Sequence, residues 1–296
     1  MGAVFASRFL EAGFTTSVIA RGERAERLRR TGLIVNGQTF PAMVIDPDEA
    51  AEPMDLILVA VKHHQLGTAL AGLHPFIAPD TTFISVMNGL DSEAIIGTSY
   101  GAEKVLLCIS VGIDALREDG AVTYTTAGKL FIGEATNERP STRVRKMQAA
   151  LERASLAYET PVDMVRMLWW KFMVNVGVNQ ASAVMRAPYG VMQTSADARA
   201  VMFGLMREVI ALAACAGVDL HDDDLDAWDR FLQTLSPQGK TSMLQDIDAG
   251  RKTEVEIFAG KAVELGQTYG IPTPMNETVL HIIRVLEETA SVTSAE

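Results

Sequence analysis

The sequence predicts an α/β domain built on a parallel sheet, followed by an all-helical domain. Up to about residue 135, short apolar segments alternate with helical patterns, which is typical of βαβ units. After Gly133-Glu134 only long helical patterns follow, and we expect no strand among them. The length of 296 residues also favours two domains, because single hydrophobic cores seldom grow past roughly 250 residues. We place these domains at residues 1–137 and 138–296.

The strands expected in the first domain are short and mostly apolar. Thr15–Ala20 is the first of them, and a charged helical segment over Glu23–Arg30 follows it. Asp55–Val61 is an almost uninterrupted apolar run, as expected for a parallel strand that is covered on both faces. The remaining expected elements are a helix over Gln65–Leu73, strands over Thr82–Met87 and Val105–Val111, and a hairpin over Ala121–Ile132.

Caps and glycines delimit the helices expected in the second domain. Pro140-Ser141 supplies a serine N-cap for the first of them. Gly217, Gly239 and Gly270 stand where later helical patterns stop. These later patterns cover Met164–Met185, Ala196–Ala216, Leu225–Leu235, Ser242–Asp248, Val255–Tyr269 and Met275–Glu288.

The chain begins with an amphipathic helical pattern that ends at Gly13. In a Rossmann-like dinucleotide-binding unit, such a helix follows the first strand and a G-x-G-x-x-G turn. Only the last glycine of that fingerprint, Gly2, is present here. The first strand is central in this fold, so its absence would leave two strand edges unpaired inside the sheet. We therefore expect about ten native residues ahead of Met1; the alternative is a chain that simply starts with a helix.

Composition argues against several classes of partner. The formal net charge of −11 disfavours binding to duplex DNA or to anionic membrane surfaces. Cys108 and Cys215 are too few for a disulfide framework, which suits a reducing cytoplasm. No apolar run reaches the roughly 18 residues of a membrane span. His63 and His64 are adjacent without a ligand cluster around them, so we expect no metal site.

The end of the first expected strand indicates which nicotinamide cofactor would bind. In the Rossmann-like fold an acidic residue at this point binds the adenosine ribose of NAD, whereas an arginine accepts the 2′-phosphate of NADP. Thr15–Ala20 ends at Arg21, whose guanidinium matches the geometry of phosphate oxygens. The arginines over Arg27–Arg30 are interpreted as a solvated helix face. The pattern therefore predicts Arg21 as a phosphate ligand.

Lys171, Asn175 and Asn179 form a polar stripe within an apolar helical pattern. Their i, i+4, i+8 spacing turns by only about 40° at each step, so the three side chains share one face. Such groups cost free energy inside an apolar helix unless they find partners. Structural pairing between helices would explain one asparagine, but three polar groups on one stripe favour a site.

Four segments occur in an order that resembles one enzyme family. They are Val61-Lys62, Met87-Asn88-Gly89, the helix with Lys171, Asn175 and Asn179, and Ser242–Asp246 with Thr253-Glu254. Together they resemble the ketopantoate reductases, the NADPH-dependent 2-dehydropantoate 2-reductases. The resemblance extends from Gly2 to the turn before Met275, and the missing glycine-rich turn is its main departure.

The resemblance implies that the chain reduces 2-dehydropantoate (ketopantoate) to pantoate with NADPH, in pantothenate and coenzyme A biosynthesis. Lys171 would be the acid that protonates the developing alkoxide, since desolvation lowers the pKa of a lysine. Glu254 would hold this lysine or a substrate hydroxyl, with Glu256 as its competitor.

The remaining substrate contacts are also implied by the resemblance. Asn175 and Asn179 would bind the substrate hydroxyl and carbonyl. Ser242 would bind the carboxylate near a helix start, where backbone amides favour anions. A plain N-cap role for Thr241 or Ser242 is the alternative.

Lys62 and Asn88 both follow carboxyl ends of expected strands, where ligands bind in open sheets. By resemblance, Lys62 contacts the cofactor or the anionic end of the substrate, and Asn88 contacts the nicotinamide ribose side. Glu134 matches an Ile-Gly-Glu segment of the family, and this match implies that it contacts the adenosine ribose. Gly2 completes this set of expected cofactor residues. The resemblance alone also implies a homodimer that forms through the helical domain.

Two other functions remain open at this point. A related NADP-dependent reductase would act on another small 2-oxo acid or a sugar phosphate, although only scattered arginines (Arg166, Arg186, Arg199) could bind such a phosphate. A catalytically impaired nucleotide-binding paralogue is suggested by the absent glycines. The intact set of Lys171, Asn175, Asn179 and Glu254 argues against it.

Overall fold

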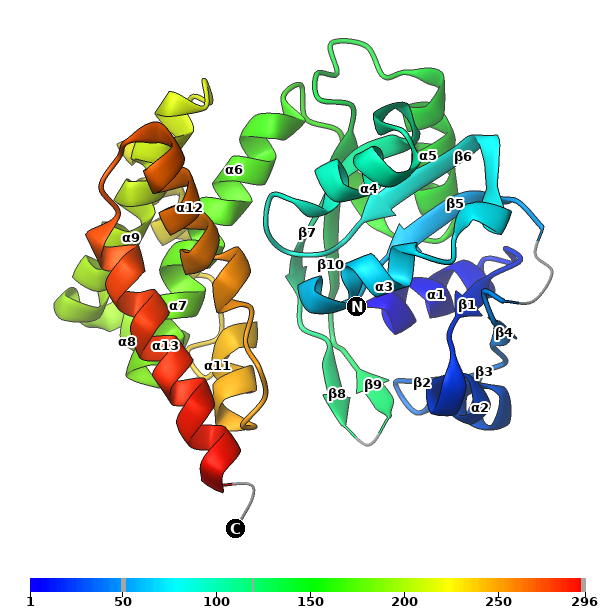
Figure 1. Cartoon of the computed structure of the whole chain (residues 1–296), viewed down its shortest axis with the longest axis horizontal. Helices are drawn as coiled ribbons and strands as arrows, with labels where there is room; N and C mark the ends of the chain where they lie inside the picture. The colour runs from blue at the N-terminus through cyan, green and yellow to red at the C-terminus, as the bar shows by residue number, and fades with distance from the viewer. Residues whose placement is uncertain (49–51, 119, 294–296) are drawn as a thin grey trace. The chain divides into compact units, whose positions relative to one another are not determined.

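The structure, a computed structural model, describes residues 1–48, 52–118 and 120–293 (Figure 1). These residues form two compact units, Met1–Met167 and Leu168–Glu296. The first unit is α/β and the second is helical, which confirms the predicted fold class. The units divide at residue 167, whereas the sequence predicts a boundary at residue 137.

The largest sheet of the first unit has five strands in the order β11-β10-β7-β6-β5. Its strands are β5 (Met54–Val59), β6 (Ile77–Ser85), β7 (Val105–Ile113), β10 (Ala127–Gly133) and β11 (Ala157–Glu159). Strands β5, β6 and β7 run parallel, in agreement with the predicted βαβ units. Strand β10 runs antiparallel to β7, and β11 runs parallel to β10.

Strand β11 contradicts the expectation that no strand follows Gly133. It has three residues, too few to reveal a period-two pattern, and two of them are exposed. The helix before it, α5 (Thr142–Arg153), packs against this strand. Because β11 pairs with β10, the segment after residue 137 belongs to the first unit, which explains the later division.

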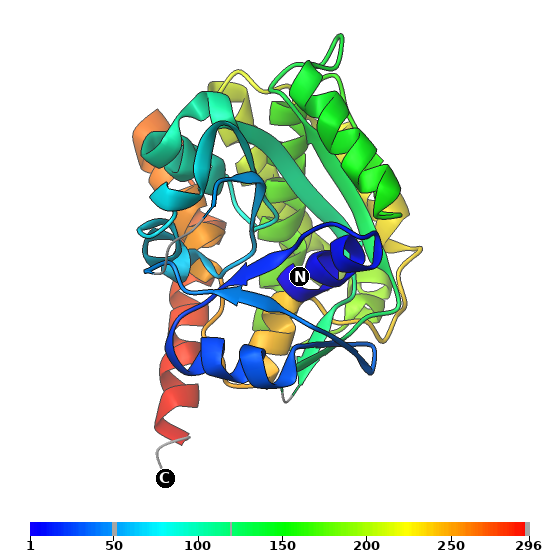
Figure 2. The ribbon, with the colours of Figure 1, turned by 90° about the vertical axis from the view of Figure 1, so that its right-hand side faces the viewer.

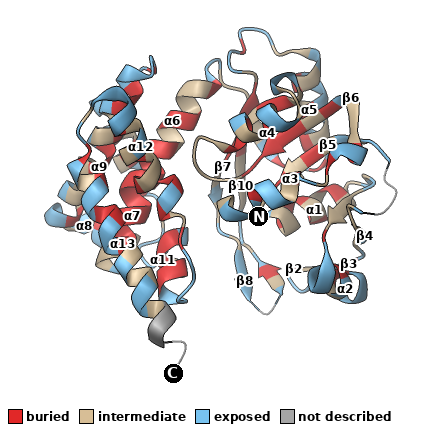
Figure 3. Ribbon diagram, in the orientation of Figure 1, coloured by how far each residue is buried: buried red, intermediate tan, exposed pale blue. Residues whose placement is uncertain are grey.

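Helices cover both faces of the five-stranded sheet (Figures 1 and 2). On one face, Phe5 and Phe9 of α1 (Gly2–Glu11) share a buried cluster with Leu151 of α5 and with residues of β6, β7 and β10. On the other face, α3 (Leu66–Leu70) and α4 (Ser92–Tyr100) cover β5 and β6. Cover on both faces is what the apolar strand sequences require, and Figure 3 shows the buried residues along these strands.

Two smaller sheets complete the first unit. Strand β1 (Ser17–Ile19) pairs in parallel with β4 (Met43–Ile45), and within the described ranges no pairing joins β1 to β5. The third sheet has the order β3-β2-β9-β8. It contains β2 (Leu33–Val35), β3 (Gln38–Phe40), β8 (Leu116–Glu118) and β9 (Ala121–Thr123), and α2 (Gly22–Thr31) packs against it.

The hairpin expected over residues 121–132 is wrong in its pairing. Strand β9 pairs with β8, whereas β10 pairs with β7, so the two halves of this segment lie in different sheets. The strand and glycine turn expected ahead of Gly2 stay a prediction.

The second unit is built around α9 (Ala196–Cys215), which packs against neighbours on several sides. The other helices are α6 (Met164–Val174), α7 (Gln180–Met185), α8 (Tyr189–Thr194), α10 (Asp222–Leu232), α11 (Ser242–Asp248), α12 (Ala259–Tyr269) and α13 (Pro274–Thr293). Helix α6 begins four residues before the second unit does. In the described part of the chain, no helix has both the length and the apolar character needed to cross a membrane.

The continuous helix expected over Met164–Met185 is interrupted by a π turn at Asn175–Asn179. At its centre is Gly177, where a Cβ atom would lie 2.4 Å from the side chain of Met206 on α9. Helix α9 can therefore approach the turn closely only because residue 177 has no side chain. The turn alters the predicted stripe, because the step from Asn175 to Asn179 follows π rather than α geometry.

Candidate active site

The predicted site residues fall into two groups, one in each unit. The second unit carries the predicted catalytic and substrate residues Lys171, Glu254, Asn175, Asn179 and Ser242. The first unit carries the predicted cofactor residues Gly2, Arg21, Lys62, Asn88 and Glu134.

Lys171 lies in the last turn of α6, one turn before the π turn, and its neighbours along the helix are apolar. Trp169 and Phe172 are both buried, and their rings meet edge to face. Burial of Lys171 itself lowers its pKa from 10.5 to about 8 by desolvation, and no charged group among the described residues contributes to the shift. An ammonium group with a pKa near neutrality can donate a proton and recover it at physiological pH.

Asn175 and Asn179 stand at the two ends of the π turn, and both are buried. Their amides bring donors and acceptors into a segment whose other residues, Val176, Gly177 and Val178, are apolar and buried. Single π turns inside α-helices are frequent at functional sites. A glycine within an otherwise helical pattern was the one sequence signal that could have indicated the turn.

Helix α11 packs against the π turn and against α7, and Ser242 is its first residue. Thr241 is the N-cap: its buried hydroxyl accepts a hydrogen bond from the Leu244 amide at 3.1 Å. Of the two residues that could have capped this helix, Thr241 therefore takes that role. Ser242 is exposed at the helix start.

Glu254 lies immediately before a short 3-10 helix, Val255–Ile257, and a buried neighbour anchors its loop. The amide and hydroxyl of Thr253 both donate to the Glu287 carboxylate on α13, at 2.7 and 2.6 Å. The sequence analysis missed Glu287, because nothing in the sequence links positions 253 and 287.

Glu256, the competitor of Glu254, has a different partner. Its two carboxylate oxygens accept hydrogen bonds from Arg284 on α13, at 2.8 and 2.7 Å. This pairing holds the pKa of Glu256 below its usual value. The Glu256 carboxylate is therefore already engaged by Arg284 at two points.

In the first unit, Lys62 and Asn88 follow the carboxyl ends of the parallel strands β5 and β6 and therefore lie at one edge of the sheet. The Lys62 amide donates to Gln65 Oε1 at 3.3 Å, where the chain turns into a short 3-10 helix. Gly2 lies nearby, since a Cβ atom there would be 3.2 Å from the Cβ of Ala60 after β5. The third glycine of the dinucleotide fingerprint serves the same close helix–strand packing.

Arg21 follows strand β1 and is the N-cap residue of α2, at the predicted strand end. Its guanidinium pairs with Asp48 at 2.9 Å and lies 3.9 Å from Asp46. The sequence analysis missed both aspartates. Exposed ion pairs of this kind contribute at most about 1 kcal/mol, so a phosphate dianion can compete for the arginine.

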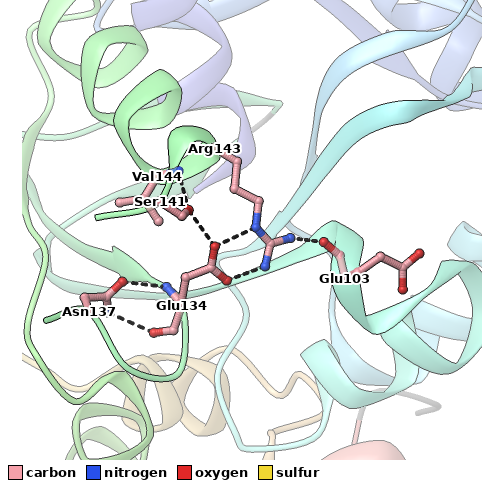
Figure 4. Close-up of polar contacts among 6 residues, drawn as sticks. All are labelled: Glu103, Glu134, Asn137, Ser141, Arg143 and Val144. Atoms are coloured by element: carbon pink, nitrogen blue, oxygen red, sulfur yellow. Dashed lines mark hydrogen bonds and ion pairs between the residues drawn. The ribbon is translucent and has the colours of Figure 1, made fainter. Parts of the chain in front are cut away.

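Glu134 lies at the other edge of the sheet. Gly133, which precedes it, is in register with Leu107 near the start of β7, whereas Asn88 follows the end of β6. The Glu134 carboxylate accepts hydrogen bonds from Ser141 Oγ at 2.7 Å and from Arg143, which also donates to the Glu103 carbonyl (Figure 4). These bonds hold its pKa below the usual value.

Asn137 completes this arrangement by bonding both the amide and the carbonyl of Glu134, each at 2.9 Å. The contacts give Glu134 a structural role at the start of α5. They lend no support to the predicted contact with the adenosine ribose.

A buried acid near Asn88 also escaped the sequence analysis. The Ser92 hydroxyl lies 2.7 Å from Glu93 Oε2 and 2.8 Å from Ser85 Oγ, and the latter accepts from the Met87 amide at 3.3 Å. Burial raises the pKa of Glu93 to about 7. This chain of polar groups ties the start of α4 to the end of β6, and so supports the loop that carries Asn88.

Comparisons with known proteins identify the family. The sequence model described as Ketopantoate reductase PanE/ApbA matches residues 1–137, and its C-terminal counterpart matches residues 163–287. The chain belongs to the ketopantoate reductase family. This confirms the resemblance seen in the sequence, and the family is one of oxidoreductases.

Relatives match nearly the whole chain. The 2-dehydropantoate 2-reductase of Archaeoglobus fulgidus is 26% identical over 97% of this chain and 95% of its own length. The uncharacterized oxidoreductase YkpB of Bacillus subtilis is 23% identical over 97% and 96%. A solved PanE/ApbA family ketopantoate reductase from Ralstonia eutropha JMP134 is 25% identical, with a TM-score of 0.84 and coverage of 97% and 95%.

A second solved structure extends the similarity of fold. D-mandelate dehydrogenase in complex with NADH and anilino(oxo)acetate has a TM-score of 0.89, with coverage of 98% of this chain and 96% of that chain. It is 19% identical, so the likeness concerns the fold alone.

We expect Lys171→Met to stabilise the protein at pH 7, because the charged ammonium loses hydration on folding. Each unit of pKa shift corresponds to about 1.4 kcal/mol, so the gain in free energy of unfolding is up to about 3 kcal/mol. The gain shrinks as pH rises from about 8 to 10.5, since folded wild type then releases a proton that the unfolded chain still binds. Urea unfolding across this pH range measures the effect.

Lys146→Met is the matched control, because Lys146 is an exposed lysine of α5. This substitution of an exposed side chain should change the free energy of unfolding little. A pH-independent result for Lys171→Met would contradict the desolvation of Lys171.

Proposed function

We propose that this chain reduces the keto group of a small branched 2-oxo acid, preferably ketopantoate, to the 2-hydroxy acid with NADPH as hydride donor. The observation that carries the proposal is the desolvated ammonium of Lys171, with a pKa of about 8, next to a turn that bears two buried amides. The relatives named 2-dehydropantoate 2-reductase support the choice of substrate.

The proton chemistry is assigned to Lys171. When bound, NADPH would supply the hydride that the keto carbon accepts, and the carbonyl π electrons would move to oxygen. Lys171 Nζ donates its proton to that oxygen, so the product is the 2-hydroxy acid and the neutral amine recovers a proton from water. Before transfer, the positive charge of the ammonium stabilises the negative charge that develops on oxygen.

The other residues of the helical unit would bind and orient the substrate. Asn175 and Asn179 can each donate an N–H and accept through a carbonyl oxygen, which suits a substrate that offers a hydroxyl and a keto oxygen. Ser242 would donate to the carboxylate. Glu254 would accept from the substrate hydroxyl or from the lysine.

The first unit would hold the cofactor. Lys62 and Asn88 lie at the sheet edge where ligands bind in open α/β sheets, and Gly2 allows α1 to pack closely there. Arg21 would exchange its partners Asp48 and Asp46 for the 2′-phosphate of NADPH. Assembly as a homodimer through the helical unit stays a prediction.

A sugar phosphate is a weaker candidate for the substrate. Of the scattered arginines, Arg199 already pairs with both carboxylate oxygens of Asp229. This leaves one fewer cation for a substrate phosphate in the helical unit.

The proposal is tested by following NADPH oxidation with ketopantoate and with a panel of other 2-oxo acids. We expect ketopantoate to be the best substrate. Lys171→Ala should lower kcat by about 10²–10⁴-fold, the usual contribution of a general acid, and change the Kd of NADPH less than threefold. If the protein reduced another 2-oxo acid and not ketopantoate, ketopantoate would be refuted as the substrate. If Lys171→Ala lowered kcat and the affinity for NADPH equally, Lys171 would be refuted as the acid.

Selection of NADPH over NADH is tested by Arg21→Ala. Loss of a charge-assisted contact of about 1.5–3 kcal/mol should raise the KM for NADPH by about 10–100-fold and leave the KM for NADH almost unchanged. Arg30→Ala, at an exposed arginine in the last turn of the same helix, is the control and should change neither. If Arg21→Ala raised the KM values for NADPH and NADH equally, Arg21 would not be the residue that binds the 2′-phosphate.

A further inference from the structure

The π turn that carries Asn175 and Asn179 is bonded to a side chain that neither the sequence motifs nor the mechanism uses. Gln180 directly follows the turn and is fully buried. Its Nε2 donates to the carbonyl oxygen of Val176 at 2.7 Å. In an uninterrupted α-helix that carbonyl would accept from the backbone amide of Gln180. Here that amide donates to the Gly177 carbonyl, and the side-chain amide takes its place.

Gln180 is in turn fixed from a second helix. Its Nε2 also donates to Oδ1 of Asn276, at 3.1 Å, and Asn276 is fully buried at the start of α13. The Nδ2 of Asn276 donates to Glu208 Oε2 at 2.7 Å and to the Leu205 carbonyl at 3.3 Å, both on α9.

Glu208 closes the chain of hydrogen bonds. Its carboxylate accepts from the backbone amides of Met275 at 2.8 Å and Asn276 at 3.0 Å, which begin α13. Residues from α7, α9 and α13 are therefore joined to one carbonyl of the π turn. Buried polar networks of this kind fix geometry, because a broken bond leaves an unpaired group in a region of low dielectric.

We propose that Gln180, Asn276 and Glu208 are positioning residues that hold the π turn, and thereby set where the amides of Asn175 and Asn179 meet the substrate. This inference rests on the proposed function for its effect on the reaction. The hold on the turn itself does not depend on what the substrate is. Without the Gln180–Val176 bond, the segment loses the contact that compensates the interrupted helix, and both asparagines shift.

The test compares Gln180→Leu with Gln193→Leu. Gln193 on α8 donates its Nε2 to the carbonyls of Leu232 and Leu235, each at 2.9 Å, so the control loses the same chemistry at carbonyls outside the turn. For Gln180→Leu we expect kcat/KM for the 2-oxo acid to fall by about tenfold to a hundredfold, as for a displacement near 1 Å. The Kd of NADPH should stay within twofold of wild type, and Gln193→Leu should alter kcat/KM less than threefold.

Hydrogen exchange of the amides over residues 175–181 provides a readout that needs no substrate. Exchange there should accelerate in Gln180→Leu and not in Gln193→Leu, even if wild type reduced no 2-oxo acid and the proposed function failed. Equal exchange in the two variants, or equal losses of kcat/KM, would overturn the positioning role. If Gln180→Leu does not fold, Asn276→Ala removes the hydrogen-bond partner of Gln180 instead. The values of kcat/KM and of hydrogen exchange over residues 175–181 in Asn276→Ala then test the positioning role.

Discussion

The loss of hydration around one ammonium group is the constraint on which the site of the helical unit depends. Burial of Lys171 in a helix whose neighbouring residues are apolar brings its pKa to about 8. The same desolvation destabilises the folded state and makes the lysine a competent proton donor. A carboxylate in contact with this ammonium would raise its pKa again. The Glu256 carboxylate is bonded to Arg284 instead.

The helical unit places further polar groups in its interior and satisfies most of them with specific partners. Gln180 bonds the π turn, Thr253 bonds Glu287, and Thr241 caps α11. Each of these bonds fixes a backbone segment that presents a predicted site residue. Burying these polar groups lowers the stability of the folded state, but it preorganises the site. Side chains that are already held in place lose little entropy when a substrate binds.

Short-range patterns in the sequence sufficed for the fold class, for the main parallel strands and for the family. They failed where a partner is distant in the chain or an element is very short. Strand β11 has three residues, and its place in the sheet depends on β10, some thirty positions earlier. The π turn depends on Met206 and Asn276 as much as on Gly177, and the pairing of Arg21 with Asp48 spans 27 positions. Glu134 matched a motif, yet Arg143 and Ser141 engage it structurally.

The most direct measurement is an NMR titration of the protein with ¹³Cε-labelled lysine, in which the Lys171 signal is identified by its absence from the spectrum of Lys171→Met. We expect a midpoint near pH 8 for that signal. A midpoint near 10.5, the ordinary value for lysine, would mean that the ammonium is fully hydrated and would contradict its role as the proton donor.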